Sequence, residues 1–429
     1  MIYIYRLIVP FIYIGLLVFR PWLGSKIRVG LSMRKKTPSG QWPWLALPRN
    51  QKPIWIHCSS GEFEYAKPVI TEIKKSFPSE KILVTYFSPT YRTNIERFPG
   101  VDFSCPLPFD LPGACRDFLD HHQPKAWLIS RTDLWPEMLH QARRRKIPSL
   151  LFSATFKPKD DFIRWAERIF DPRKAMVDRI FVVSPKDEAN APTHLRDKIQ
   201  VMGDTRYDQV LARLEDPKPT KPISKMDDRK TLIAGSTWEK DESVLLDATE
   251  DLLKNQILRL ILVPHEPTED HMKGLVQQVL SRGLSVETYS ELDTEPPKAD
   301  VLVIDKVGLL AELYLQADIG FVGGSFQGSV HSVMEALGAG LPTIVGPHHL
   351  NNREALEFKS IRSPSSGQAY LYAVKDAKEL KDVLKRLSNE SLVELGYEIT
   401  KEVTSRAGAS LKVVEALGLS KPFSQRIDA

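Results

Sequence analysis

A glycine turn near the C-terminal third of the chain has the residue types that bind phosphate. Gly323-Gly324-Ser325 lies between an apolar run, Ile319 to Val322, and a helical pattern from Val330 to Ala339. Glycines at such a junction let backbone N–H groups approach a phosphate, and a helix N-terminus favours negative charge. On its own the turn fits a purely structural role better than a phosphate site. Glu335 on the following helical pattern favours a nucleotide, because a carboxylate there can accept hydrogen bonds from ribose hydroxyls.

A carboxylate suited to proton transfer follows a second small-residue turn. Ser59-Ser60-Gly61-Glu62 comes directly after the apolar run that begins at Pro53 and before a helical pattern from Glu64 to Ser76. A helix N-terminus keeps Glu62 ionised, so that it can accept a proton as a general base. The same position also suits a carboxylate that only stabilises the helix, and the two roles are compatible.

Other polar residues come at the ends of further apolar runs. Ser236 and Thr237 are hydroxyls that could hold phosphate oxygens or cap a helix. Asp133 precedes Pro136 and is predicted to cap the helix that begins there. His265 and His348 lack the spacing of a zinc site and are therefore predicted to be nucleotide or structural contacts.

Apolar runs of strand length alternate with helical patterns through most of the chain. This alternation predicts an α/β fold with parallel sheets covered by helices on both faces, and such sheets bind ligands outside the carboxyl ends of their strands. After the strand that begins at Pro53, the predicted strands are Ile82 to Phe87, Ala126 to Ser130, Ser149 to Ser153, Arg179 to Val183, Ile199 to Met202, Thr231 to Ala234, Leu258 to Val263, Val301 to Ile304, Ile319 to Val322 and Thr343 to Val345.

Five segments are expected along the 429 residues. Residues 1–45 form an N-terminal anchor with a basic flank, and 46–215 a first Rossmann-like domain. The proline-rich, charged segment 216–228 is interpreted as a linker. A second Rossmann-like domain covers 229–390, and the helical patterns of 391–429 are candidates to cross back to the first domain.

The N-terminal segment is apolar and then basic. Nine Lys and Arg, and no Asp or Glu, precede Glu62, although the net charge of the whole chain is only +5. The uncharged run from Leu7 to Phe19 is shorter than the roughly 20 residues of a spanning helix and contains Pro10. A helix lying in the membrane interface, with its basic flank against anionic lipids on the cytoplasmic side, is therefore predicted. The alternative, a secretory signal peptide, lacks a suitable cleavage site.

Three scattered cysteines, Cys58, Cys105 and Cys115, give neither a disulfide framework nor a metal cluster. Such usage is typical of a protein in a reducing compartment.

Seven motifs together resemble the 3-deoxy-D-manno-octulosonic acid (Kdo) transferases, which move Kdo from CMP-Kdo to the lipid A precursor. The resemblance extends from the N-terminal anchor to the last helix. The seven motifs are HCSSGE (57–62), DLWPE (133–137), GDTRYD (203–208), GSTWEKDE (235–242), VPHEP (263–267), GGS with HSVME (323–325 and 331–335), and GPHHLNN (346–352).

The resemblance implies a GT-B fold, with two Rossmann-like domains facing a cleft, and an inverting reaction with Glu62 as general base. It implies no bound metal or other cofactor, and no nucleic acid partner. CMP-Kdo, a lipid A precursor and an anionic membrane surface are the implied partners, at the cytoplasmic face of the inner membrane. The implied acceptor-binding residues are Ser59, Ser60, Gly61, Asp133 and Trp135. The implied donor-binding residues are Arg206, Ser236, Thr237, His265, Gly323, Gly324, Ser325, His331, Glu335, His348 and Asn351.

The chain departs from the family pattern at several positions. Where the family commonly shows Glu-x-Glu-Leu-Trp-Pro-Asn, this chain has Arg131 to Glu137, so an acidic position has become basic. Two alternatives therefore stay open. One is another GT-B enzyme of envelope glycan synthesis with a different nucleotide sugar, and the other is a catalytically silent nucleotide-binding protein at the membrane surface.

Overall fold

The computed structural model describes residues 2–35, 52–158, 173–223, 229–293 and 295–418. Contacts divide the chain into two units, Met1–Gln209 with Arg406–Ala429, and Val210–Ser405. Helix α10 (Thr205–Glu215) begins in the first unit and ends in the second. The second half of the basic flank, the start of the domain predicted at residue 46, and the end of the predicted linker lie outside the described residues.

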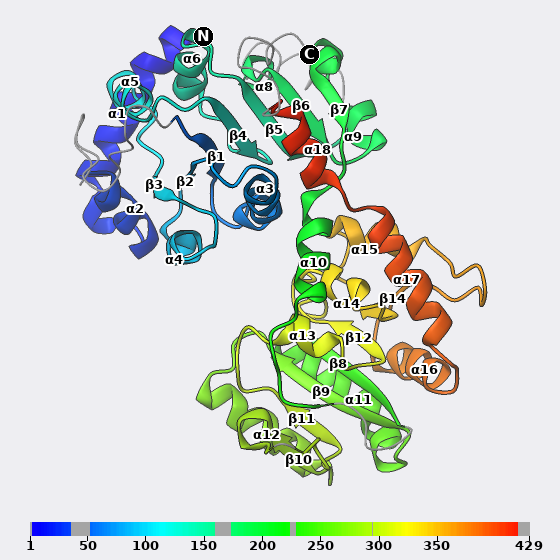
Figure 1. Cartoon of the computed structure of the whole chain (residues 1–429). Coiled ribbons are helices and arrows are strands. Elements are labelled where there is room, and N and C mark those ends of the chain that lie inside the picture. The colour runs from blue at the N-terminus through cyan, green and yellow to red at the C-terminus, as the bar shows by residue number, and fades with distance from the viewer. Residues whose placement is uncertain (1, 36–51, 159–172, 224–228, 294, 419–429) are drawn as a thin grey trace. The chain divides into compact units, whose positions relative to one another are not determined.

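The first unit contains a seven-stranded sheet in the order β3-β2-β1-β4-β5-β6-β7, and every neighbouring pair is parallel (Figure 1). Its strands are β1 (Ile54–Cys58), β2 (Ile82–Tyr86), β3 (Phe103–Pro106), β4 (Ala126–Ser130), β5 (Ser149–Ala154), β6 (Arg179–Val182) and β7 (Ile199–Val201). Its helices are α1 (Ile2–Val18), α2 (Ser25–Lys35), α3 (Phe63–Ser76), α4 (Arg92–Glu96), α5 (Pro112–His122), α6 (Pro136–Arg144), α8 (Arg173–Met176), α9 (Pro185–Asn190) and α18 (Ala409–Ala416), with short 3-10 turns that include η1 (Arg20–Trp22).

Both faces of this sheet are buried, which explains why its strands are apolar along their whole length. On β1, Trp55 belongs to one core, with side chains of α5 and α6, while Ile54 and Ile56 belong to the other, with α3 and α4. Val413 and Val414 of α18 complete this second core, although almost the whole second unit lies between them and α10 in the sequence. The chain therefore returns to the first unit to finish it.

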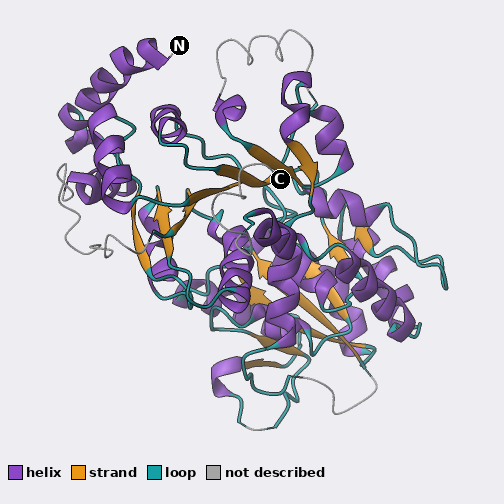
Figure 2. Ribbon diagram, turned by 45° about the horizontal axis from the view of Figure 1, so that its top comes forward, coloured by secondary structure: helices purple, strands orange, loops and turns teal. Residues whose placement is uncertain are grey.

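The second unit repeats this architecture with strand order β10-β11-β9-β8-β12-β13-β14, again parallel throughout. Helices flank the strands of each sheet (Figure 2). The strands are β8 (Lys230–Thr237), β9 (Leu258–Pro264), β10 (Val286–Thr288), β11 (Val301–Val303), β12 (Ile319–Val322), β13 (Thr343–Val345) and β14 (Leu371–Ala373). The helices are α11 (Glu239–Lys254), α12 (Glu269–Ser281), α13 (Leu310–Tyr314), α14 (Met334–Gly338), α15 (Arg353–Lys359), α16 (Ala377–Ser388) and α17 (Val393–Ser405).

The predicted α/β class with parallel sheets is confirmed, and all the predicted strands exist within one to three residues of their expected ends. Three strands were not predicted: β3, β10 and β14. Each lies at the edge of its sheet and is only three or four residues long, so it lacks the longer apolar run that marks an interior strand.

Two helix predictions are wrong. The pattern from Val330 forms a helix only from Met334, because Val330 and His331 donate their N–H groups to the carbonyls of His348 and Gly323 instead. The single helical pattern from Ser391 to Ala416 is split into α17 and α18 by Gly408, which has a φ of 95°, in the left-handed region that glycine tolerates.

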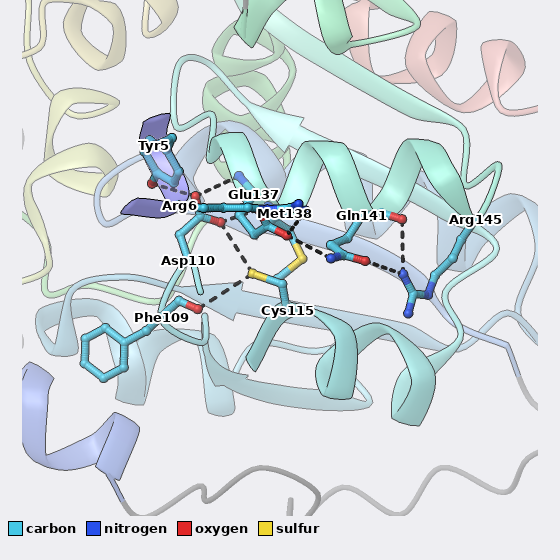
Figure 3. A network of polar contacts seen from close by, with 9 residues as sticks. All are labelled: Tyr5, Arg6, Phe109, Asp110, Cys115, Glu137, Met138, Gln141 and Arg145. Atoms are coloured by element: carbon cyan, nitrogen blue, oxygen red, sulfur yellow. Dashed lines mark hydrogen bonds and ion pairs between the residues drawn. The ribbon is translucent and has the colours of Figure 1, made fainter. Parts of the chain in front are cut away.

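Helix α1 is fixed to the first unit by a buried polar network (Figure 3). Arg6 Nε and Nη2 donate to Glu137 at 2.7 and 2.9 Å, and the Tyr5 hydroxyl donates to Asp110 at 2.7 Å. Burial would raise the pKa of Glu137, but the hydrogen bonds from Arg6 and Gln141 hold it below its ordinary value. The one charged side chain of α1 is thereby turned inward and neutralised.

The opposite side of α1 is an uncharged surface, the α1 stripe. Its side chains are all more than half exposed and recur three or four residues apart: Tyr3, Ile4, Leu7, Ile8, Phe11, Ile12, Ile14 and Val18. Within the part of the chain that the structure describes, no helix combines the length and hydropathy needed to cross a bilayer.

We expect Arg6→Ala to lower the free energy of unfolding by about 2 kcal/mol, because it leaves the fully buried Glu137 carboxylate without its cation. The pKa of Glu137 is lowered in the folded chain. The contribution of the Arg6–Glu137 pair to the free energy of unfolding is therefore fully present above the ordinary glutamate pKa, and it is lost as the pH falls through the lowered pKa of the folded chain. Urea denaturation at several pH values measures it. Lys26→Ala, on the exposed side of α2, is the control, and equal effects of the two variants would contradict the assignment.

Candidate functional site

The strand order places one candidate site at a switch point of the first sheet. The β1 and β4 strands are neighbours in the sheet. After β1 the chain continues to β2 on one side of this pair, and after β4 it continues to β5 on the other side. Ligands of parallel sheets bind in the crevice outside the carboxyl ends at such a point. Ser59 to Glu62 follow β1, and Arg131 to Asp133 follow β4, so both predicted segments lie at this crevice.

Glu62 is held in place at one carboxylate oxygen. Its Oε2 accepts the Ser60 N–H at 2.9 Å, and its backbone carbonyl accepts the Ser130 hydroxyl at 2.9 Å. The side chain stands immediately before α3 and is only partly buried. Among the described residues no hydrogen bond is made to Oε1, so this oxygen is available to a hydroxyl group of a ligand.

Asp133 does not cap α6, and that prediction is wrong. The first N–H groups of α6, from Glu137 and Met138, donate instead to Asp110 at 2.9 and 2.8 Å. Asp133 Oδ2 bonds to the fully buried His57 Nε2 at 2.8 Å. Burial would raise the pKa of Asp133, but hydrogen bonding and charge interaction with His57 hold it below the ordinary value. An ionised carboxylate therefore stands beside the Glu62 turn.

His57 was not selected as a site residue from the sequence, although it is part of the HCSSGE motif. It lies in the middle of an apolar strand, and its Nδ1 bonds to the Thr85 hydroxyl of β2 at 2.8 Å. His57 thus links β2, β1 and the loop after β4. A polar residue interrupting a fully buried strand was the available signal.

The remaining acceptor candidates line the same edge. The carbonyl of Ser59 accepts the N–H groups of Phe87 and Ser88 at 3.0 and 2.8 Å, which fixes the turn against the end of β2. Gly61 has only the Tyr91 ring near the position of a side chain. Trp135 stacks on Phe87 with ring centroids 5.0 Å apart, so it forms an aromatic wall next to the turn.

Two arginines converge on Tyr65, in the first turn of α3. Arg131 donates to the Tyr65 hydroxyl at 2.7 Å and Arg206 donates to it at 3.3 Å, and both guanidinium groups lie over its ring. Arg131 has a φ of 64°, in the left-handed region. Arg131 thus joins Arg206, and Tyr65 holds two cations one turn from Glu62.

In the second unit the predicted glycine turn also lies at a switch point, between β8 and β12. Its N–H groups are already bonded, however. Asp241 of α11, which is fully buried, accepts the Gly324 N–H at 2.8 Å and the Phe326 N–H at 3.0 Å. The Gly323 N–H donates to the Gly235 carbonyl at 2.9 Å. The N–H groups of Gly323 and Gly324 are therefore occupied within the described chain, and the assignment of Gly323 to Ser325 to phosphate binding stays a prediction.

The close packing of this turn also explains its residue types. A Cβ at Gly323 would lie 2.3 Å from the Ser236 carbonyl oxygen, so only glycine fits. Ser325 is fully buried, and its hydroxyl donates to the Val322 carbonyl and accepts the Gly346 N–H. Ser325 therefore joins the ends of β12 and β13 and presents no hydroxyl to solvent.

Thr237 is likewise internal, while Ser236 stays at the edge. The Thr237 hydroxyl donates to the buried Glu242 at 2.8 Å, and Glu242 also bonds His271 at 2.8 Å. Burial lowers the pKa of His271, but its bonds to Glu242 raise it, and the net direction is upward. Ser236 has a φ of 54° and a partly exposed side chain.

An aromatic cluster stands at the ends of β8 and β9. The Trp238 indole donates to His331 at 3.2 Å, and His331 stacks on His265 with ring centroids 4.4 Å apart. Burial, and then the neighbouring His265, lower the pKa of His331, which favours its neutral form. The predicted residues His265 and His331 are thus brought together, and the exposed His265 ring offers a flat surface to a ligand.

The other donor candidates differ in their surroundings. His348 and Asn351 are exposed in the loop after β13. Glu335 stands second in α14, where its Oε1 accepts Arg213 Nη1 at 3.0 Å. Arg213 also pairs with Glu312, so it bridges two carboxylates. A ribose at Glu335 would share this carboxylate with Arg213.

Within the described residues no three His, Cys, Asp or Glu side chains gather in a way that could hold a metal ion. The three cysteines are free and buried.

The sequence matches the family model described as 3-deoxy-D-manno-octulosonic-acid transferase (kdotransferase) over residues 29–209. It is 27% identical over 350 residues to 3-deoxy-D-manno-octulosonic acid transferase of Bordetella pertussis, covering 75% of this chain and 80% of that protein. To the transferase of the same name in Haemophilus influenzae it is 28% identical over 397 residues, with 87% of each covered.

Solved structures share the fold. UDP-GlcNAc 2-epimerase of Neisseria meningitidis, solved with UDP-GlcNAc, superposes with a TM-score of 0.57 at 17% identity, covering 85% of this chain and 98% of that one. A glycosyltransferase of Rickettsia africae gives 0.52 at 10% identity, covering 88% and 99%.

We expect Asp241→Ala to lower the free energy of unfolding of the second unit by about 3 kcal/mol, because the N–H groups of Gly324, Phe326 and Trp238 lose their common acceptor. Urea denaturation, with unfolding detected by hydrogen exchange at residues of the second unit, measures this loss of stability. Asp247→Ala on the same helix, a surface ion pair with Arg282, should change stability by about 0.5 kcal/mol or less. Similar losses in both variants would show that Asp241 does not organise the turn.

Proposed function

We propose that the chain is a glycosyltransferase of the kind it resembles, the 3-deoxy-D-manno-octulosonic acid (Kdo) transferases, which the match over residues 29–209 and the 27–28% identity to two such enzymes support. The donor is CMP-Kdo and the acceptor is a lipid A precursor, at the cytoplasmic face of the inner membrane. The proposed mechanism is supported mainly by the position of Glu62. Its carboxylate lies at the switch point of the first sheet, and one of its oxygens is fixed by the Ser60 N–H.

Glu62 acts as the general base. Its free oxygen takes the proton from an acceptor hydroxyl while the hydroxyl oxygen forms a bond to the anomeric carbon of Kdo. The bond from that carbon to the phosphate oxygen breaks on the opposite face, so CMP leaves and the configuration is inverted. The Ser60 N–H fixes the direction of the carboxylate, which is the positioning that such a step requires.

Positive charge for this reaction comes from side chains. The Gly323 N–H donates to Gly235, and the Gly324 and Phe326 N–H groups donate to Asp241, so we take the turn as a scaffold for the donor residues around it. We assign CMP to the surface of His265, His331 and Ser236, with Glu335 at the ribose. Arg206, together with Arg131, is placed to attract the carboxylate or phosphate of a substrate at the first unit.

The α1 stripe supports attachment to the membrane surface. Eight apolar side chains are exposed on one side of α1, while Arg6 on the other side is paired with Glu137. A helix of this kind lies in the interface between head groups and acyl chains. Lys26 and Arg28, exposed on α2, would meet anionic lipids, each contributing about 1 kcal/mol.

Glu62→Gln should lower the transfer rate at least about 100-fold, because the amide cannot accept the acceptor proton. Binding of CMP, measured as a rise in melting temperature, should be unchanged. Glu64→Gln is the matched control two residues along the chain, and it should keep activity within a few-fold. Transfer that persists in Glu62→Gln would refute the base, and stabilisation by UDP in preference to CMP would indicate a different activated sugar.

Leu7→Glu and Phe11→Glu should each weaken binding to vesicles of anionic phospholipid about tenfold, since each removes one apolar anchor of the α1 stripe. The two side chains are 69% and 73% exposed, so the folded chain tolerates the change. Co-sedimentation with vesicles measures the binding. The control is Leu350→Glu, an equally exposed leucine of the second unit, and an equal loss there would contradict a role of α1.

A further inference from the structure

A cavity of about 810 Å³ lies between α2 and the outer edge of the first sheet, and we call it the α2 pocket. Residues of η1 and α2 form one wall, and the ends of β2 and β3 with α4 form the other. Its lining residues are Arg20, Arg28, Val29, Ser32, Met33, Tyr86, Arg92, Glu96, Ser104 and Pro106. None of the site residues discussed above belongs to it.

The charges in the α2 pocket are predominantly positive, with three arginines against one glutamate. Arg92 is paired with Glu96 at 2.7 Å. Arg20 donates to the neutral hydroxyl of Ser32 at 2.5 Å, and the Arg28 guanidinium makes no hydrogen bond or ion pair with any described residue. Two guanidinium groups therefore stand at the pocket without a carboxylate partner, which is the composition that binds phosphate.

The rest of the lining is apolar or aromatic. Val29 and Met33 face the pocket from one side of α2, and Pro106 closes it from β3. Tyr86 is only 2% exposed, and its hydroxyl has no hydrogen bond to a described residue. Burial raises the pKa of this hydroxyl, so it remains a neutral donor. The pocket thus combines cations with an apolar wall, as an amphiphilic ligand requires.

The wall formed by α2 is firmly attached. The buried Arg34 donates to the carbonyls of Leu107 at 2.9 Å and Phe87 at 2.8 Å, and its guanidinium lies 4.2 Å from the centre of the Phe87 ring. These contacts fix α2 to the ends of β2 and β3. The α2 pocket is therefore a preformed feature of the first unit.

The position of the pocket relates it to both the base and the membrane. Tyr86 pairs in register with Cys58, the residue directly before the turn that carries Glu62. On the outer side, Val18 ends the α1 stripe, and the exposed Phe19 connects it to Arg20. A molecule anchored by acyl chains at α1 would pass the pocket on its way to the Glu62 crevice.

We propose that the α2 pocket binds a phosphate group of the acylated acceptor, through Arg20, Arg28 and Arg92, while the acceptor hydroxyl lies at Glu62. This inference rests on the proposed function, because it gives the acceptor a second point of attachment. Two points of attachment fix which hydroxyl of a sugar reaches the base. The pocket is then a determinant of acceptor specificity.

The test uses the full chain with a phosphorylated lipid A precursor in neutral detergent micelles, and the same lipid after enzymatic removal of its phosphates. Arg28→Gln and Arg92→Gln should each weaken equilibrium binding of the phosphorylated lipid and raise its KM about tenfold, at unchanged kcat. The dephosphorylated lipid should bind the variants and the wild type equally. Lys26→Gln on α2 and Arg97→Gln after α4 remove a charge outside the pocket and should have no effect.

Equal effects of all four substitutions, or an equal loss with the dephosphorylated lipid, would overturn the proposal. A second outcome would also overturn it. If the pocket variants lost affinity for phosphatidylcholine vesicles containing phosphatidic acid but still bound the micellar acceptor normally, the phosphate bound in the pocket would be that of a membrane lipid. The binding measurement needs no transfer. A wild type that binds the phosphorylated lipid through the pocket but transfers no sugar would refute the proposed function and leave the pocket assignment supported.

Discussion

The order of the parallel strands is the constraint on which the rest of the structure depends. In each unit the chain turns outward in opposite directions from two adjacent central strands, β1 with β4 and β8 with β12. Loops that leave adjacent strands toward opposite sides open a crevice at the carboxyl edge. The Glu62 turn and the Asp133 loop lie at the first crevice, and the Trp238 and Gly324 turns at the second. Every candidate residue is positioned by this arrangement before any side-chain contact is considered.

Carboxylates then fix the loops of both units. The buried Asp241 holds the glycine turn, and the buried Asp110 caps α6. A buried carboxylate is costly unless several donors surround it, so each of these two enforces one loop conformation. The partly buried Asp208 accepts the N–H groups of Gly408 and Ser410 where α18 returns to the first unit. The loops that carry the candidate chemistry are therefore rigid, which suits the positioning of a reactive hydroxyl.

The sequence predicted the interior strands and the turns that follow them, because fully buried parallel strands are continuous apolar runs. It could not predict the partners of those turns. Gly324 and Asp241 are 83 residues apart, and His57 and Asp133 are 76 apart, so local pattern gives no sign that they meet. For the same reason Asp133 was assigned to the nearest helix, although a fully buried histidine bonds it. The pairing of Arg131 with Arg206 on Tyr65 likewise depends on three separate segments.

The return of the C-terminal segment to the first unit has a consequence for biosynthesis. Val413 and Val414 fill a core whose other members are synthesised in the first half of the chain. Domains generally fold as the ribosome delivers them, from the N-terminus onward. Here the earlier unit must wait with an incomplete core until almost the entire chain has emerged, while the later unit has all its residues by Ser405. The segment made first is thus the last to be finished.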